Sequence, residues 1–188
     1  EVKKPATPAI DVHCHLGVLP EVPMKMTDVD SIVHHLEREG FEYAVCSAPV
    51  AYREDVDLGN HEMMDKIASH PKLLGSPVIS PTHIETSIKW LDILTQTDKL
   101  AHVTLGPDNE AERAGSDAYM ELLAEAAKRN VPIFYNSGAQ DLSSGLRWQR
   151  KLGYTPWIRG TSPEEFAMFV EADRWHPNLP IIIGHGMG

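Results

Sequence analysis

Near its start the chain reads Ile-Asp-Val-His-Cys-His at residues 10–15, which is typical of the end of a short buried strand. Side chains two positions apart on a strand point to the same face, so His13 and His15 can present two imidazoles to one cation. Cys14 points to the opposite face. Imidazole is the commonest neutral metal ligand at physiological pH, and two of them supply half of a typical zinc site. The motif alone is also consistent with two unrelated histidines at a strand end.

Length and composition indicate one globular domain. The chain has 188 residues, which is enough for one sizeable core, and we expect residues 1–188 to form a single domain behind a flexible leader at residues 1–8. The apolar fraction is 42%, and no apolar run approaches the roughly 20 residues of a membrane-spanning helix. The net charge of −10 argues against a nucleic-acid or anionic-membrane surface, because both partners require clustered Lys and Arg.

The leader and the two cysteines are the residues relevant to the cellular compartment of the protein. The leader is polar, contains proline and does not begin with Met. It is consistent with a start after a removed signal peptide or with an artificial boundary, so the localisation stays open between cytoplasm and export. The two cysteines, Cys14 and Cys46, fall in or beside predicted strands. We interpret both as buried free thiols, since a disulfide would require adjoining strands with suitable geometry.

Short β-branched runs alternate with amphipathic helical segments along the whole chain. Strands are predicted at residues 10–13, 43–48, 73–79, 101–105, 131–135 and 181–184, and helices at 27–40, 60–69, 84–94, 116–129 and 161–175. Pro77 predicts an irregular middle for the third strand. Such alternation indicates βαβ units and a parallel sheet. Six strands and five helices fit either an open doubly wound sheet or an incomplete TIM-type (β/α) barrel.

Polar residues gather where these strands end, which is where parallel α/β folds place their functional groups. The strand ends supply His13, His15, Ser47, Thr104, Asn136 and His185. His102 lies inside the fourth predicted strand, and we expect it to face the helical layer. No Gly-x-Gly-x-x-Gly or Walker-type loop is present, so the usual signature of nucleotide binding is missing.

Three separated blocks carry a family resemblance. Residues 10–17, 130–138 and 179–188 resemble the first-, fifth- and sixth-strand segments of the amidohydrolase superfamily. The similarity is to its amidohydrolase-related branch of metal-dependent hydrolases and aminocarboxymuconate-semialdehyde decarboxylase-like enzymes. The resemblance implies a (β/α)8 barrel with a divalent metal, zinc by expectation, at its C-terminal mouth. It assigns His13 and His15 as metal ligands, and His185 as a further ligand or a catalytic acid/base.

Two departures from the family pattern matter. Asn136 stands where the family usually has a histidine, and an amide oxygen is a poorer zinc ligand than imidazole. The family also has an aspartate at the end of strand eight. Only six strands are predicted in this sequence, so we expect residues 1–188 to lack the last two β/α units. Thr104 lies near the place of a bridging lysine in some binuclear members, so we do not expect a lysine-bridged metal pair.

The segment after the fifth predicted strand is rich in arginine and tryptophan. Asn136 and Arg147, Trp148, Arg150, Trp157 and Arg159 are the candidates for substrate contacts. Guanidinium groups bind carboxylates through two parallel hydrogen bonds, and tryptophan can cover a planar substrate. The alternative is an ordinary surface loop with a small core of its own.

We therefore predict a metal-dependent hydrolase that acts on a small, carboxylate-bearing molecule. The alternatives are a metal-dependent decarboxylase of the same fold, in which His185 moves the proton, and a catalytically inactive barrel that binds a ligand or partner. A homo-oligomer is a further expectation, because an incomplete barrel exposes sheet edges that a second chain could cover.

Overall fold

The computed structural model describes residues 7–18, 27–106, 115–136 and 163–184. Strands and helices alternate through them, as predicted. The strands are β1 (Ile10–His15), β2 (Tyr43–Ser47), β3 (Leu73–Gly75), β4 (Val78–Ile79), β5 (Val103–Leu105), β6 (Ile133–Tyr135) and β7 (Ile181–Ile183). The helices are α1 (Val29–Glu39), α2 (Pro49–Arg53), α3 (Val56–Ala68), α4 (Ile84–Leu94), α5 (Asp117–Lys128) and α7 (Pro163–Trp175).

Within the described residues, all paired strands run parallel, in two ladders. The first has the order β1-β2-β3 and the second β4-β5-β6-β7. A bridge between Gly75 and Leu100 joins them. The predicted strand 73–79 is divided at Pro77, which has no N–H to give to a ladder. Its carbonyl accepts the Thr104 N–H at 2.8 Å, so the chain passes here from the first ladder to the second.

The helix boundaries confirm some predictions and correct others. Asp28 caps α1, one residue after the predicted start of this helix at residue 27, because its carboxylate accepts the Ser31 N–H at 2.9 Å. Gly40 ends α1 with a φ of 82°, the left-handed conformation that favours glycine at this position. The bounds of α4 are those predicted.

No helix was predicted between residues 48 and 60, but this segment contains α2 and the first turn of α3. Asp55 starts α3 by accepting the Leu58 N–H at 2.8 Å. Gly59 weakens the helical pattern of this segment, yet it is required by the packing. A Cβ at Gly59 would lie 2.1 Å from the Ala51 nitrogen, so the absence of a side chain lets α2 and α3 cross closely.

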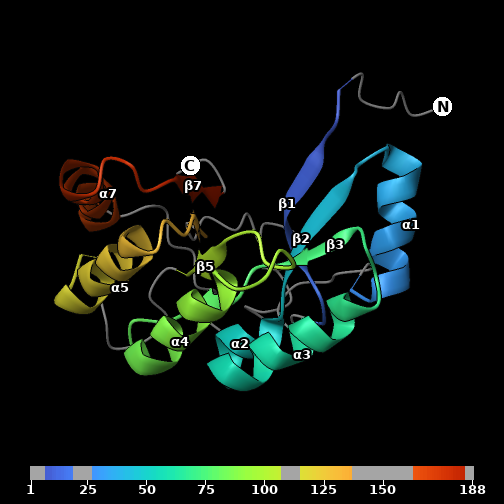
Figure 1. The fold of residues 1–188 in the computed structure, drawn as a ribbon, viewed down its shortest axis with the longest axis horizontal. Coiled ribbons are helices and arrows are strands. Elements are labelled where there is room, and N and C mark those ends of the chain that lie inside the picture. The colour runs from blue at the N-terminus through green and yellow to red at the C-terminus, as the bar shows by residue number, and fades with distance from the viewer. Residues whose placement is uncertain (1–6, 19–26, 107–114, 137–162, 185–188) are drawn as a thin grey trace, which may run out of the picture.

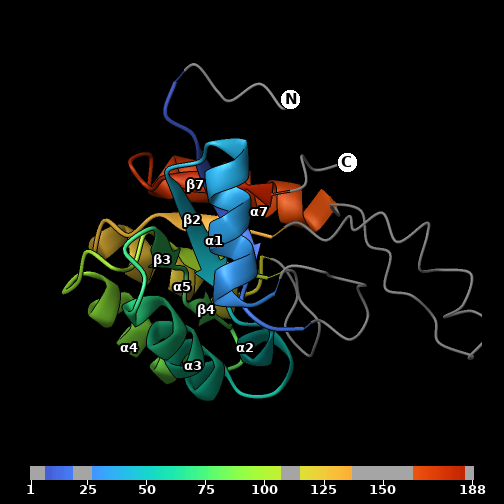
Figure 2. The same cartoon turned by 90° about the vertical axis from the view of Figure 1, so that its right-hand side faces the viewer.

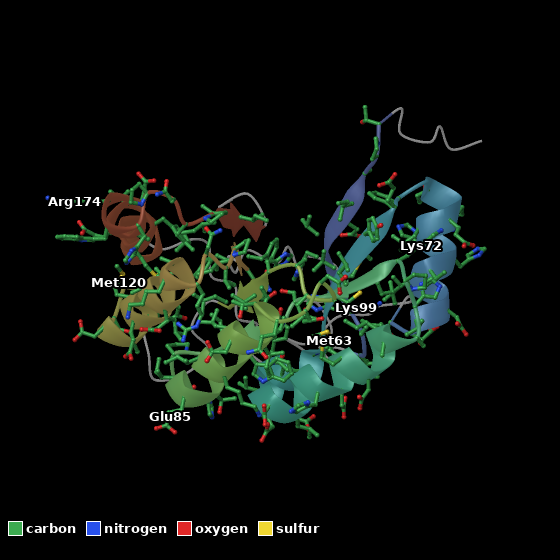
Figure 3. All side chains as sticks on the ribbon, viewed as in Figure 1. Met63, Lys72, Glu85, Lys99, Met120 and Arg174 are labelled. Carbon is green, nitrogen blue, oxygen red and sulfur yellow. The ribbon has the colours of Figure 1, made fainter. Side chains whose placement is uncertain are left out.

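The helices form an arc outside the strands (Figure 1). Figure 2 shows α1 standing in front of β2. One apolar cluster packs α4, α5 and α7 against β5 and β6 and includes Trp90, Leu91, Val103, Leu122, Ile133 and Met168. A second packs α1 and α3 against β2 and β3 and includes Ile32, Leu36, Ala44, Met63, Ile67 and Leu73. Met63 lies inward beneath β3, whereas Glu85 and Arg174 project outward (Figure 3).

The other face of the strands is the inside of a partial barrel. Ile133 and Tyr135 belong to the helix-side cluster, so Phe134 between them faces the opposite side. There its ring centroid lies 4.5 Å from that of His13. β1 and β6 belong to different ladders, so this contact requires the strands to curve around one interior. The prediction of an incomplete (β/α) barrel is therefore confirmed, and the alternative of an open doubly wound sheet is wrong.

The described part of the barrel has β1 at one edge and β7 at the other. Ile10, Val12 and Ile182 on these strands are 49%, 38% and 38% exposed, which is high for β-branched apolar side chains. Among the described helices, none is long and apolar enough to cross a membrane.

Candidate metal centre

The end of β1 brings together the two histidines predicted as metal ligands. The ring centroids of His13 and His15 lie 4.6 Å apart, with an angle of 79° between the ring planes. Both side chains are partly buried. Two adjacent imidazoles on one strand are a donor pair that fits zinc and other first-row divalent cations.

An irregularity in β1 sets the direction of these rings. The pairing of β1 with β2 shifts register between Asp11 and Cys14, and such shifts re-aim side chains beside functional sites. The Asp11 carboxylate stabilises the irregular backbone. Its Oδ1 accepts the His13 N–H at 3.1 Å, and its Oδ2 accepts the Cys14 S–H at 3.1 Å. Sequence reasoning missed this role of Asp11, although its place two residues before the first histidine was a usable signal.

The His13 ring is held in place by a contact with β6, across the barrel interior from β1. Its ring stacks on Phe134 with an angle of 13° between the planes. Phe134 is in turn fitted against Gly184, where a Cβ would lie 2.6 Å from the Phe134 Cζ. Glycine at this position therefore leaves the space that the Phe134 ring occupies under His13.

The His15 ring is held in place by side chains of β2 and α2. Its Nδ1 lies 3.3 Å from the Ser47 Oγ, and the same oxygen lies 3.1 Å from the Tyr52 hydroxyl. Ser47 also donates to the Cys14 carbonyl at 3.4 Å. The edge of the Tyr52 ring faces His15, with centroids 5.9 Å apart. Tyr52 was missed in the sequence because no helix was predicted between residues 48 and 60.

Two further hydroxyl groups, those of Thr104 and Ser76, lie buried beyond Tyr52. Burial raises the pKa of Tyr52 to about 12, against the opposing effect of hydrogen bonds from Ser47 and Thr104. Thr104 and Ser76 are both buried, and their oxygens lie 2.6 Å apart. Hydroxyl groups thus connect β1 and β2 to β5 through the interior.

His102 contradicts its predicted orientation. It precedes β5 and faces the barrel interior, where its ring stacks on Phe134 with a centroid distance of 5.6 Å. The side chain is buried and its Nε2 has no hydrogen-bond partner in the described part of the chain. Burial lowers the pKa of His102 to about 4, so the ring is neutral at pH 7.

Both cysteines are free, as predicted. Cys14 and Cys46 are register partners on β1 and β2. Cys46 is buried, while Cys14 is half-buried. The hydrogen bond with Cys46, burial and the charge of Asp11 raise the pKa of Cys14 strongly, so its sulfur stays in the thiol form. Cys14 is therefore a hydrogen-bond donor to Asp11 and not a thiolate ligand.

The remaining predicted site residues divide into one that is described and six that are not. Asn136 is partly buried at the end of β6 and donates its backbone N–H to the Leu105 carbonyl at 2.9 Å. The others, which are His185, Arg147, Trp148, Arg150, Trp157 and Arg159, lie outside the described residues. In residues 7–18, 27–106, 115–136 and 163–184, no group of three or more His, Cys, Asp or Glu side chains is placed to hold a metal ion.

Comparisons with known proteins give a clear result only at the level of structure. No protein-family model and no curated protein sequence matches the chain. Solved structures match over nearly the whole chain. The 2,6-dihydroxybenzoate decarboxylase from Rhizobium aligns with a TM-score of 0.69 at 15% identity, covering 96% of this chain and 67% of that protein.

Two further structures align in the same way. The 5-carboxyvanillate decarboxylase from Novosphingobium aromaticivorans, complexed with manganese and 4-hydroxy-3-methoxy-5-nitrobenzoic acid, has a TM-score of 0.68 at 11% identity, covering 98% of this chain and 68% of that one. A protein described as a probable 2-pyrone-4,6-dicarboxylic acid hydrolase from Acinetobacter baumannii, with citric acid bound, has a TM-score of 0.53 at 16% identity and covers 94% and 69%. The chain thus spans about two thirds of each, and it has the (β/α)-barrel fold of these two decarboxylases and this hydrolase.

Proposed function

We propose that the chain is the metal-binding part of an amidohydrolase-type enzyme that acts on a small, carboxylate-bearing molecule. The observation that carries the proposal is the adjacency of the His13 and His15 rings at the end of β1, 4.6 Å apart. Their partners support it. Metal-binding histidines are typically oriented by further hydrogen bonds, and here Asp11 holds the backbone of His13 while Ser47 faces the Nδ1 of His15.

His13 and His15 would hold a divalent cation, together with His185. Such a cation would act as a Lewis acid toward a substrate carboxylate or carbonyl. Imidazole ligands suit zinc, while one structurally similar decarboxylase contains manganese, so both cations belong in the test. Asn136 would contact substrate at the end of β6. His185 would also move a proton, since imidazole titrates near neutral pH.

The arginine- and tryptophan-rich segment completes the proposal on the substrate side. Arg147, Arg150 and Arg159 would pair with substrate carboxylates, because a guanidinium group donates two parallel hydrogen bonds to them. Trp148 and Trp157 would cover a planar substrate. The interior beside the candidate site is aromatic, since the buried Phe134 ring stacks on His13 and on His102.

We place decarboxylation ahead of hydrolysis. Two of the three structurally similar proteins described above are decarboxylases, of 2,6-dihydroxybenzoate and 5-carboxyvanillate, and one is a probable hydrolase. In decarboxylation the bond between the ring carbon and the carboxylate breaks, carbon dioxide leaves, and the carbon takes up a proton that a group such as His185 would supply. Hydrolysis remains the second candidate because of the similarity to that hydrolase.

One assay separates the candidates. The chain is loaded with Zn²⁺ or Mn²⁺ and incubated with a panel of hydroxybenzoic acids and cyclic esters that carry carboxylates. Carbon dioxide is measured by gas chromatography, and ring opening is followed by the loss of ultraviolet absorbance. Carbon dioxide release that His13→Ala abolishes supports the decarboxylase, and ring opening with the same dependence supports the hydrolase. Substrate binding without turnover, unchanged in His13→Ala, would replace both with a catalytically inactive barrel.

A further inference from the structure

The hydroxyl groups around His15 carry an inference that rests on the proposed metal centre and deepens it. We propose that Ser47 and Tyr52 are positioning residues, which hold the His15 ring in the tautomer with the proton on Nδ1. That tautomer leaves the Nε2 lone pair as the metal donor. Neither residue contacts a cation in this proposal, since both act through His15.

The strand pairing fixes the first contact. His15 and Ser47 are register partners on β1 and β2, so the backbone places their side chains next to each other. The Ser47 Oγ lies 3.3 Å from the His15 Nδ1, which is within reach of an N–H···O hydrogen bond. Nδ1 is the ring nitrogen nearer the backbone, so the contact leaves Nε2 on the opposite side of the ring.

Counting protons assigns the direction of this hydrogen bond. A serine hydroxyl has one proton and two acceptor lone pairs. Ser47 directs its proton to the Cys14 carbonyl at 3.4 Å. Its oxygen can then accept from the Tyr52 hydroxyl at 3.1 Å and from the His15 Nδ1. This arrangement satisfies every group only if Nδ1 carries the proton, so Nε2 does not.

Packing keeps Tyr52 in place. Tyr52 lies on α2, which crosses α3 at Gly59 without an intervening side chain. Its ring edge contacts the His15 ring, and its hydroxyl interacts with Thr104. Thr104 is itself paired with Ser76 at 2.6 Å. Tyr52 therefore connects Ser47 to buried hydroxyl groups that lie outside β1.

The first test reads the tautomer directly and needs no metal. The intact chain is labelled with ¹⁵N-histidine, and two-bond ¹⁵N–¹H spectra distinguish protonated Nδ1 from protonated Nε2; His15→Gln assigns the signal. The expected result is protonated Nδ1 at His15, with Nε2 protonated in a large share of molecules in Ser47→Ala. Ser47→Thr keeps a hydroxyl and should restore the original tautomer. Protonated Nε2 in the unaltered chain would overturn the inference.

The second test measures metal affinity with Co²⁺ as the probe, by visible absorption and calorimetry. We expect Ser47→Ala to bind Co²⁺ about 10- to 100-fold more weakly, as is typical when a partner of a metal-binding histidine is lost. Tyr52→Phe should shift affinity in the same direction by a smaller factor. Tyr43→Phe is the matched control, since Tyr43 is an exposed tyrosine on β2 away from His15.

The outcomes distinguish this inference from the proposed function. Equal Co²⁺ affinities and identical spectra in the unaltered chain, Ser47→Ala and Tyr52→Phe would overturn the inference while leaving the metal centre standing. Failure of the unaltered chain to bind Co²⁺ would overturn the metal centre and the inference with it. Circular dichroism shows whether each variant is folded, and if Ser47→Ala unfolds, the tautomer in the unaltered chain and the Co²⁺ affinity of Tyr52→Phe still test the inference.

Discussion

Asp11 stabilises the irregular backbone at the end of β1 and so directs two neighbouring side chains at once. One carboxylate oxygen accepts the His13 N–H, and the other accepts the thiol of Cys14. A carboxylate in this position satisfies a backbone group that the shifted register removes from the ladder. The spacing Asp-x-His-x-His therefore describes a local structure as well as two ligands.

Replacement of Asp11 by alanine tests this role. Asp11→Ala leaves the His13 N–H without its acceptor, so the free energy of unfolding should fall by about 1–3 kcal/mol, and Zn²⁺ affinity should fall as well. Urea denaturation and calorimetry measure the two effects. Asp30→Ala, at an exposed position in the first turn of α1, is the control. Unchanged stability and unchanged affinity in Asp11→Ala would show that the carboxylate is dispensable.

His102 makes stability depend on pH. Its pKa is lowered from 6.5 to about 4 by burial, so between these values the unfolded chain takes up a proton that the folded chain does not. The contribution of His102 is complete above pH 6.5 and is lost as the pH falls toward 4. The free energy of unfolding should decrease by roughly 3 kcal/mol over that window from this group alone.

His102→Leu isolates the effect, because leucine fills the space without a titratable group. Urea denaturation at pH 4.5 and pH 7 should show a smaller difference in unfolding free energy for the variant than for the unaltered chain. The comparison is between the two pH values within each protein, so a change in overall stability does not affect it. Equal differences in both proteins would mean that His102 is not buried in the neutral form.

At the scale of elements, the close crossing of α2 and α3 determines where Tyr52 lies. Gly59→Ala normally stabilises a helix by up to about 1 kcal/mol. Here the added Cβ would meet the Ala51 backbone, so we expect the free energy of unfolding to fall by about 1–3 kcal/mol. Displacement of α2 should also weaken Co²⁺ binding through Tyr52.

Thermal denaturation and Co²⁺ calorimetry test this prediction together. Gly106→Ala is the control, because its Cβ would come no closer than 4.0 Å to the Tyr52 ring and should change stability by less than about 0.5 kcal/mol. A more stable Gly59→Ala variant would show that the two helices have room to separate.

The sequence predicted the elements well where hydrophobic periodicity was strong. The bounds of α4 and the Gly40 end of α1 are as expected, since apolar spacing and a left-handed glycine are local signals. α2 was not predicted, because five residues carry too little periodicity. The early start of α3 was hidden by Gly59, which has low helix propensity and is needed only for a tertiary contact.

At the scale of the whole molecule, curvature decides which residues meet. His13 and Phe134 are far apart in sequence and lie on strands of different ladders, yet their rings stack. The sequence identified the polar residues at the strand ends, including His13, His15, Ser47 and Thr104. It could not reveal that Tyr52, Ser76 and His102 also face the interior, because this depends on how the strands curve and pack.

Binding of one divalent cation by His13 and His15 can be measured as the metal content of the purified chain. The chain is incubated with Zn²⁺ or Mn²⁺, dialysed, and analysed by mass spectrometry of metals, beside His13→Ala, His15→Ala and the exposed control His34→Ala. We predict close to one equivalent of metal in the unaltered chain and in the control, and less than about a tenth of that in either site variant. Equal metal content in all four proteins, or none in the unaltered chain, would show that His13 and His15 do not form a metal site.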